Sequence, residues 1–180
     1  MTHRLFIGAV PGRKQLDELK QYQQTILPCC ERASLTKEQN LHLTLRFIGE
    51  VEESQTKKII AAVSALEFKP KEEYFSKIKK YGFFDRRDGL LVYADLEVSD
   101  EIYLLVEAME TSLRKVGVKP ERRKWLPHIT VARRVMLSPG SEKLPQMQQT
   151  SSVQPFSDVH LFLSEFTPQG MKYTSLVHLL

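Results

Sequence analysis

Apolar and polar residues follow two different periods along this chain, and together they predict strands interspersed with helices. Runs of β-branched and aromatic residues between turn residues predict strands, and apolar residues spaced three or four apart predict helices. The predicted strands cover residues 4–10, 41–48, 74–84, 90–98, 128–135, 156–166 and 171–180, and the predicted helices cover residues 14–26, 55–66 and 101–116.

Turn and capping residues set the expected limits of these elements. Ser54 and Asp100 stand where helix caps are expected, and Gly117 stands where the third helix would end. The polar stretches 31–40 and 137–154 lack a regular pattern, so we expect loops there. Because helices are mixed with strands along the chain, the sequence predicts the α+β class.

Two of the predicted strands carry the same short motif. Residues 41–50 read "LHLTLRFIGE" and residues 127–136 read "PHITVARRVM". Because successive side chains of a strand point to opposite faces, His42 shares a face with Thr44, and His128 shares a face with Thr130. The apolar residues between them then face a core. We therefore expect the two strands to face each other across a cleft and to form one active site.

The spacing of the two motifs also bears on the architecture. They lie 86 positions apart, near the ends of two comparable halves that each offer a helix and a small sheet. This faint repeat predicts two pseudo-symmetric lobes of small antiparallel sheets with helices outside, with one His-x-Thr-x strand per lobe facing a central cleft. We expect residues 1–180 to form a single domain of two intertwined lobes.

Composition narrows the class of protein. The chain has 180 residues, of which 42% are hydrophobic and 27% charged, with a formal net charge of +4, as expected of a globular protein that can bind an anionic partner. Cys29 and Cys30 are adjacent, which is poor geometry for a structural disulfide, so we expect reduced thiols. We find no pattern of a signal peptide or of a membrane span, and we expect a cytoplasmic location.

The paired histidines suit phosphodiester chemistry without a metal. Near neutral pH one imidazole can accept a proton from water while the other donates a proton to the leaving oxygen. Threonine hydroxyls and a nearby arginine can hold the phosphoryl oxygens as charge develops. The remaining histidines lack the motif, and we interpret them as surface or structural residues: His3, His160 and His178.

The segments "HLTLRF" and "PHITVAR" closely resemble the paired motifs of the two-histidine (2H) phosphoesterases. More narrowly, they are similar to the LigT-type RNA 2′,3′-cyclic phosphodiesterases, also called 2′-5′ RNA ligases. The opening "RLFIGAVP" and the late hairpin also agree with that family. The resemblance implies His42 as proton donor, His128 as proton acceptor, and Thr44 and Thr130 as their partners. The residues themselves leave the order of donor and acceptor open.

The sequence departs from the family in the middle strand. Where the family usually has a Pro–Arg–aliphatic block, this chain has "DRRDGLLVYADL", so Arg86 and Arg87 either replace that arginine or belong to a turn. Substrate contacts in this region are therefore open.

Three further arginines are candidates for binding the phosphate. Strict alternation places Arg46 on the face of His42, and it places Phe47 in the core. Arg133 has the family position after the second motif, but alternation points it away from His128. A β-bulge would bring it round, and otherwise Arg134 faces the cleft.

Two basic runs have aromatic neighbours. "KIKK" at 77–80 and "ERRK" at 121–124 lie beside aromatic residues, a combination that suits single-stranded RNA and equally suits an ordinary basic surface with core aromatics.

The leading hypothesis is therefore metal-independent opening of RNA 2′,3′-cyclic phosphate ends to 2′-phosphates, with 2′-5′ ligation as the possible reverse. The same chemistry on a small molecule, such as ADP-ribose cyclic phosphate, is the first alternative, and a catalytically decayed RNA-binding module is the second. A metal site at the two histidines is least favoured, because no carboxylate or cysteine lies at ligand spacing. We expect a monomer that needs no cofactor and binds RNA 3′ ends or small cyclic-phosphate nucleotides.

Overall fold

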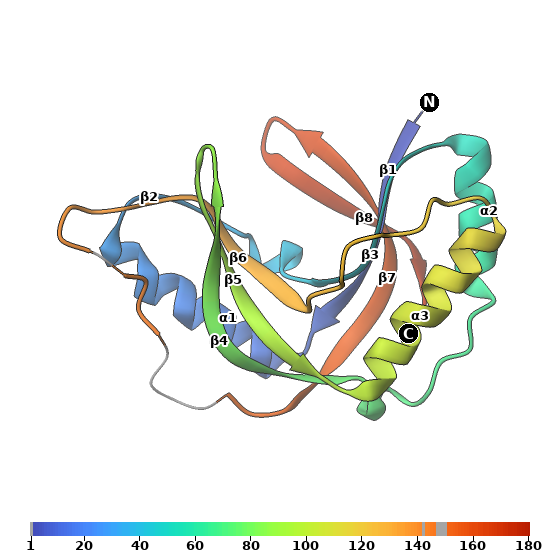
Figure 1. Ribbon diagram of the computed structural model, residues 1–180, viewed down its shortest axis with the longest axis horizontal. Coiled ribbons are helices and arrows are strands. Elements are labelled where there is room, and N and C mark those ends of the chain that lie inside the picture. The colour runs from blue at the N-terminus through green and yellow to red at the C-terminus, as the bar shows by residue number, and fades with distance from the viewer. Residues whose placement is uncertain (1, 142, 147–150) are drawn as a thin grey trace.

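The computed structural model describes residues 2–141, 143–146 and 151–180, and these residues build a mixed α+β fold (Figure 1). The α-helices are α1 (Arg13–Ile26), α2 (Glu53–Ser64) and α3 (Asp100–Lys115). The strands are β1 (Thr2–Pro11), β2 (Cys30–Leu35), β3 (Leu43–Glu52), β4 (Phe75–Arg86), β5 (Gly89–Val98), β6 (His128–Leu137), β7 (Gln154–Thr167) and β8 (Gly170–His178).

The strands form two antiparallel groups that meet at short pairings. One group has the order β3-β1-β7-β8, and the other has the order β2-β6-β5-β4. Strands β3 and β6 meet at the pair Leu43–Ile129, and β4 meets β7 at Phe75 and Ser76. The predicted α+β class and the placement of one motif strand in each group are therefore confirmed.

The helices lie outside these strands. Helices α2 and α3 pack on each other and against β3, and α2 also contacts β1 and β8, whereas α1 packs against β6 and β7. Figure 1 shows α2 and α3 at one end of the molecule and α1 beneath the other, with the hairpins β4–β5 and β7–β8 projecting to the same side. None of the described helices combines the length and the apolar character that a membrane span requires.

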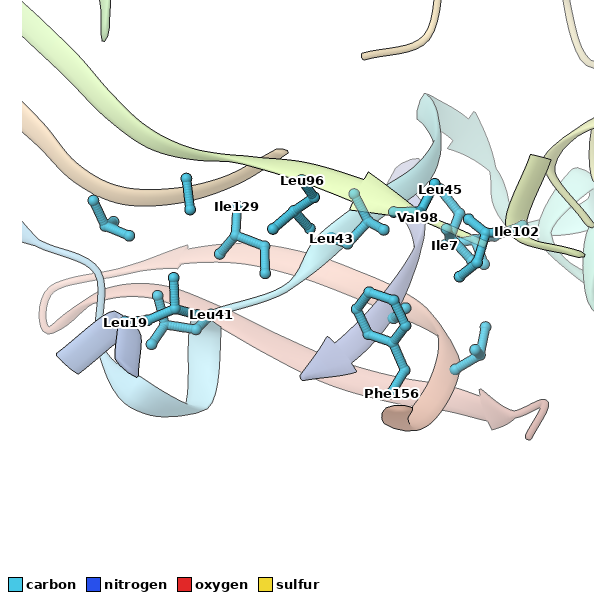
Figure 2. Close-up of a cluster of buried hydrophobic side chains, with 14 of the residues drawn as sticks. Ile7, Leu19, Leu41, Leu43, Leu45, Leu96, Val98, Ile102, Ile129 and Phe156 are labelled. Atoms are coloured by element: carbon cyan, nitrogen blue, oxygen red, sulfur yellow. The ribbon is translucent and has the colours of Figure 1, made fainter. Parts of the chain in front are cut away.

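The core lies behind the two motif strands. Leu43 and Leu45 of β3 and Ile129 of β6 are almost completely buried, and Figure 2 shows them together with Ile7 of β1. Burial of a leucine or isoleucine side chain stabilises a fold by about 1.5–3 kcal/mol, which fixes the register of both strands. Since these apolar side chains face inward, the alternating polar positions of the motifs face the opposite side.

The region 31–40, which we expected to be a loop, contains an additional strand. Strand β2 ("CERASL") runs along β6 at the edge of its group, from Cys30 opposite Leu137 to Leu35 opposite Ala132. It shows no apolar alternation because it pairs through its backbone while most of its side chains remain partly exposed. The predicted loop 137–154 lies in part outside the described residues, at 142 and 147–150.

Candidate active site

The single pairing between β3 and β6 brings the two motifs together. Leu43 lies opposite Ile129, so the residues on either side of each, His42 with Thr44 and His128 with Thr130, flank this pair. In an antiparallel register Thr44 comes opposite His128, and His42 comes opposite Thr130. The charge of His128 also contributes to lowering the pKa of His42, as expected for two imidazoles close together. The motifs are thus neighbours, although 86 positions separate them in sequence.

Each imidazole is oriented by a backbone carbonyl two residues before it. Nδ1 of His42 lies 2.7 Å from the Asn40 carbonyl oxygen, and Nδ1 of His128 lies 2.8 Å from the Leu126 carbonyl oxygen. A carbonyl only accepts hydrogen bonds, so each Nδ1 carries a proton and each Nε2 is the nitrogen that can exchange one. Nε2 of His42 lies 3.0 Å from Oγ1 of Thr44, whose hydroxyl donates to it when the ring is neutral.

Aromatic rings enclose both histidines. The His42 ring lies 4.7 Å from Phe6 and 5.2 Å from Tyr173, and the His128 ring lies 5.5 Å from Tyr93 and 5.9 Å from Phe84 (centroid distances). These rings hold the imidazoles in place and limit their access to water. Phe84 was noted from sequence only as an aromatic beside the basic run at 77–80. None of the four rings was predicted to contact a histidine, because each lies far from its histidine along the chain.

These surroundings lower the pKa of His42 well below that of an ordinary histidine. Burial lowers the pKa of His42 to about 4, the Asn40 carbonyl opposes that shift, and the charge of Arg133 adds to it. His42 is therefore neutral at pH 7 in the free protein. A bound anion would raise the pKa again, because it would offset the charge of Arg133.

A β-bulge follows each motif directly. On β3, Thr44 lies opposite Gly8 and Arg46 lies opposite Ile7, so Leu45 is an extra residue. On β6, Thr130 lies opposite Tyr93 and Ala132 lies opposite Val92, so Val131 is the extra residue. After each bulge the alternation of faces is reversed.

This reversal overturns strict alternation at Arg46 and Phe47. Arg46 points into the interior, where only 7% of it is exposed. Its Nε donates to Glu110 at 2.6 Å, and its other nitrogens donate to the carbonyls of Phe47 and Lys119. Phe47, expected in the core, is 41% exposed and lines the cleft. Arg46 therefore has protein partners for its guanidinium, and we now give it a positioning role.

The same reversal brings Arg133 to the face of His128 and Thr130. This is the arrangement expected from the sequence if a β-bulge followed the second motif. Arg133 lines the cleft, and the structure gives it no ion pair with a described carboxylate. Arg134 adopts φ 51° at a second register shift in β6 and is not among the cleft residues. The geometry thus favours Arg133 over Arg134 and Arg46 as the phosphate contact.

Side-chain donors complete the backbone hydrogen bonding at both bulges. The indole Nε1 of Trp125 donates to the Thr44 carbonyl at 2.9 Å, and the buried amide of Gln23 donates to the Val131 carbonyl at 2.8 Å. The Val131 carbonyl also accepts from the Thr36 N–H at 2.9 Å, so the Gln23 amide is its second donor. Both side-chain donors add hydrogen bonds that stabilise the bulged conformation. They are positioning residues that the motif itself does not reveal.

A cleft of about 830 Å³ extends toward α3, and of the four motif residues Thr44, His128 and Thr130 line it, whereas His42 does not. Only one of the two basic runs reaches it: Arg123 and Lys124 line the cleft beside Trp125, whereas residues 77–80 do not. Arg86 also lines it and lies over the Phe84 ring at 5.4 Å, but Arg87 does not. Tyr81, next to the other run, is a core residue stacked on Tyr22.

Comparisons with known proteins agree with this architecture. A model of the LigT like Phosphoesterase family matches residues 10–91, which include the first motif. An RNA 2′,3′-cyclic phosphodiesterase of Methanothermobacter thermautotrophicus is 28% identical over 98% of this chain and 97% of its own length.

Solved structures share the fold. TT0787 of Thermus thermophilus has a TM-score of 0.80 at 22% identity, covering 98% of this chain and 96% of its own. E. coli LigT in complex with 3′-AMP has a TM-score of 0.76 at 19% identity, covering 99% and 97%. The chain is thus similar to the LigT like Phosphoesterase family over residues 10–91 and to RNA 2′,3′-cyclic phosphodiesterases along nearly its whole length.

Proposed function

We propose that this protein opens the 2′,3′-cyclic phosphate at RNA ends to a 2′-phosphomonoester without a metal ion. The observation that carries the proposal is the pair of imidazoles, each held through Nδ1 by a backbone carbonyl, in two motifs that meet at Leu43 and Ile129. An acid and a base at one phosphate suffice for this hydrolysis. Relatives of similar length carry the name RNA 2′,3′-cyclic phosphodiesterase, which supports the substrate class.

In the proposed reaction, water attacks phosphorus in line with the bond to the 3′-oxygen. Nε2 of His128 takes a proton from this water, and Nε2 of His42 gives a proton to the departing 3′-oxygen. The phosphorus–O3′ bond breaks and the phosphate stays on the 2′-oxygen. Thr44, Thr130 and Arg133 hold the other phosphoryl oxygens as negative charge develops on them.

His42 can act as the proton donor and His128 as the acceptor only if His42 is protonated when the substrate is bound. His42 is neutral in the free protein, since burial lowers its pKa to about 4, and a neutral ring protonated on Nδ1 has no proton on Nε2 to give to the leaving oxygen. We propose that His42 takes up its proton when the anionic phosphate binds beside it and beside Arg133. The reverse order, with His42 as acceptor, requires no such uptake and remains the alternative.

The residues that line the cleft also indicate how the nucleotide attached to the phosphate would bind. Phe47 is exposed on the His42 side, and Trp125 lies on the same side with Arg123 and Lys124 nearby. A nucleobase stacked on Phe47 with its backbone along the basic residues matches how single-stranded RNA is bound. The volume of about 830 Å³ also admits a single nucleotide, which favours a small cyclic-phosphate substrate as second candidate.

The test is product analysis on two substrates. An oligonucleotide that ends in a 2′,3′-cyclic phosphate and ADP-ribose cyclic phosphate are each incubated with the protein in excess EDTA. We expect a 2′-phosphate on the oligonucleotide, and no product from the His42→Ala/His128→Ala double variant. A 3′-phosphate product, or turnover that EDTA abolishes and zinc restores, would contradict the proposal. Faster turnover of ADP-ribose cyclic phosphate would select the second candidate.

Reverse ligation is tested with the same protein. Microscopic reversibility permits a 5′-hydroxyl to take the place of water and to form a 2′-5′ bond. Because water is in large excess, we expect ligation only at high concentrations of both RNA ends. It should require the same two histidines as hydrolysis, and ligation that survives in His128→Ala would separate the two reactions.

A further inference from the structure

We propose that the hairpin of β7 and β8 binds a divalent transition-metal ion of the zinc class at Asp158, His160 and His178, outside the active-site cleft. Among the described residues, these three offer ligand atoms that all lie within 4.8 Å of one another. From sequence, His160 and His178 looked like ordinary surface or structural residues, and none of the three lines the cleft. The inference does not depend on the proposed reaction.

Strand pairing brings the three side chains together. His160 on β7 lies directly opposite His178 on β8, and their rings stack with centroids 4.8 Å apart. Asp158 precedes His160 by two residues on β7, and Nε2 of His178 lies 3.1 Å from its Oδ1. The end of β8 is further held by hydrogen bonds between Val159 and Leu179 and between Val159 and Leu180. The ligands therefore stand on rigid paired strands rather than on a loop.

The chemistry of the three ligands selects the kind of ion. Two imidazoles and one carboxylate suit zinc, copper or nickel, whereas calcium and magnesium prefer oxygen ligands alone. Three protein ligands leave a fourth position for water. Nδ1 of His160 lies 2.8 Å from Oγ of Ser175, so one nitrogen of this ring already has a polar partner and Nε2 is left for the ion. Tetrahedral zinc with bonds of about 2.0–2.2 Å places ligand atoms roughly 3.3–3.6 Å apart, a separation that His178 and Asp158 already approach and that the widest pair reaches by closing about an ångström.

The charges around the cluster act in both directions. The carboxylate of Asp158 favours a bound cation. Lys71 acts against a bound cation, because its Nζ lies 3.4 Å from Oδ1 of Asp158. An ion would displace Lys71 from Asp158, and removal of the lysine charge should favour the ion.

The location indicates what the ion would do. His160 belongs to a row of rings that leads to the active site. Its centroid lies 5.1 Å from Phe162, which lies 5.1 Å from Phe6, which in turn contacts His42. An ion here would link the C-terminal strand β8 to β7, which pairs with β1 on its other side. We therefore infer a structural ion that stabilises this group of strands and takes no part in proton transfer.

The test is a titration of the metal-free protein with zinc chloride. The background variant His42→Ala/His128→Ala is included, so that zinc bound by the active-site imidazoles is separated from zinc bound by the hairpin. We expect one zinc per chain in the wild type and in this background. His160→Gln and His178→Gln should each weaken binding by about 10- to 100-fold or more, since loss of even an outer partner costs that much. His3→Gln, outside the cluster, should leave binding unchanged.

A second variant changes the affinity in the opposite direction. Lys71→Gln should tighten zinc binding, which partial unfolding of a variant could not do. Zinc should also raise the Tm of the wild type but not of His160→Gln, because a ligand that binds only the folded state stabilises it. Turnover should be equal with zinc and with EDTA. Unchanged zinc affinity in both His160→Gln and His178→Gln, or no binding at a roughly tenfold excess of zinc over protein, would overturn the proposal.

Discussion

The motif strands β3 and β6 have the same backbone arrangement through the motif and the bulge after it. They differ in which side chains are buried or exposed beyond the bulge. Each has a histidine held by the carbonyl two residues before it, a threonine two residues after it, and a bulge directly after the threonine. Beyond the bulge, β3 buries Arg46 and exposes Phe47, whereas β6 buries Ala132 and exposes Arg133. The shared arrangement positions two imidazoles, and in the proposed reaction the difference gives each strand a separate contact with the ligand.

A second difference lies opposite the threonines. Gly8 faces Thr44, whereas Tyr93 faces Thr130. A Cβ on Gly8 would lie 3.3 Å from Cδ2 of His42, so the absence of a side chain lets the imidazole approach β1 closely. On the other strand the Tyr93 ring occupies the corresponding place beside His128. This accounts for the deep burial that lowers the pKa of His42 to about 4.

The largest expected effect comes from removing what the two strands share. His42→Ala and His128→Ala should each lower kcat by about 10²–10⁴-fold, the usual contribution of a positioned acid or base. Both variants should fold normally, because the core residues behind them are untouched. The measurement is single-turnover cleavage of a cyclic-phosphate oligonucleotide, with circular dichroism as the control for folding. Near wild-type turnover in either variant would refute the two-histidine mechanism.

The residual activity of His128→Ala also decides the order of the histidines. If His42 is the donor, kcat/KM of this variant should fall as the pH rises above about 4, and kcat should fall only at higher pH because bound phosphate raises the pKa of His42. If His42 is the acceptor, the residual activity should rise through about pH 4 and then stay level. The two profiles have opposite slopes, so one pH series distinguishes them.

A smaller effect should separate Arg133 from Phe47. Arg133→Met removes a charge that stabilises the transition state, so kcat should fall by about 10²–10³-fold. Phe47→Ala removes a surface for a base, so KM should rise with kcat nearly unchanged, by an amount that corresponds to about 1–3 kcal/mol of lost stacking. Arg134→Met is the matched control, since it lies one residue further along β6 but does not line the cleft. If Arg133→Met behaved like Arg134→Met, the division of roles would be wrong.

These comparisons show what the sequence could and could not predict. The proximity of the two motifs, with His42, Thr44, His128 and Thr130, was predictable because a repeated motif on two apolar strands is visible in the chain itself. Arg46 and Phe47 were misplaced because a bulge leaves no local signal: its evidence is the register against β1, a strand far away in sequence. For the same reason Arg133 could be placed only by allowing a bulge.

The remaining errors have related causes. Strand β2 was missed because an edge strand that pairs through its backbone requires no apolar alternation. The cluster on β7 and β8 was not foreseen because its members become neighbours only through the pairing of His160 with His178. Local pattern therefore predicted most elements and the repeated motif, whereas register and pairing decided which other side chains join a site.

Protein stability should reflect the burial of His42 on a scale of a few kcal/mol. The pKa of His42 is about 4 in the folded protein and close to 6.5 when unfolded, so the unfolded chain binds more protons between these values. Stability should therefore decrease as the pH falls from about 6.5 to 4, by on the order of 2 kcal/mol from this group. Urea unfolding of the wild type and of His42→Gln across this range measures the difference. Equal pH dependence in both proteins would show that burial does not shift His42.

The smallest expected effect comes from Gly8→Ala, which tests why His42 lies deeper than His128. The added Cβ would lie 3.1 Å from the Phe6 ring and 3.3 Å from the His42 ring, so these rings must each move by a few tenths of an ångström. A displacement of about 1 Å can cost 10²-fold in rate, so this smaller one should lower kcat about two- to tenfold. The shift should also expose His42 and raise its pKa in the folded protein. The loss of stability between about pH 6.5 and 4 should then be smaller than in the wild type. Phe6→Leu gives the added methyl group room, so the double variant Gly8→Ala/Phe6→Leu should lose less activity than the two single effects combined. Strictly additive losses would mean that Gly8 does not act through the packing of these rings around His42.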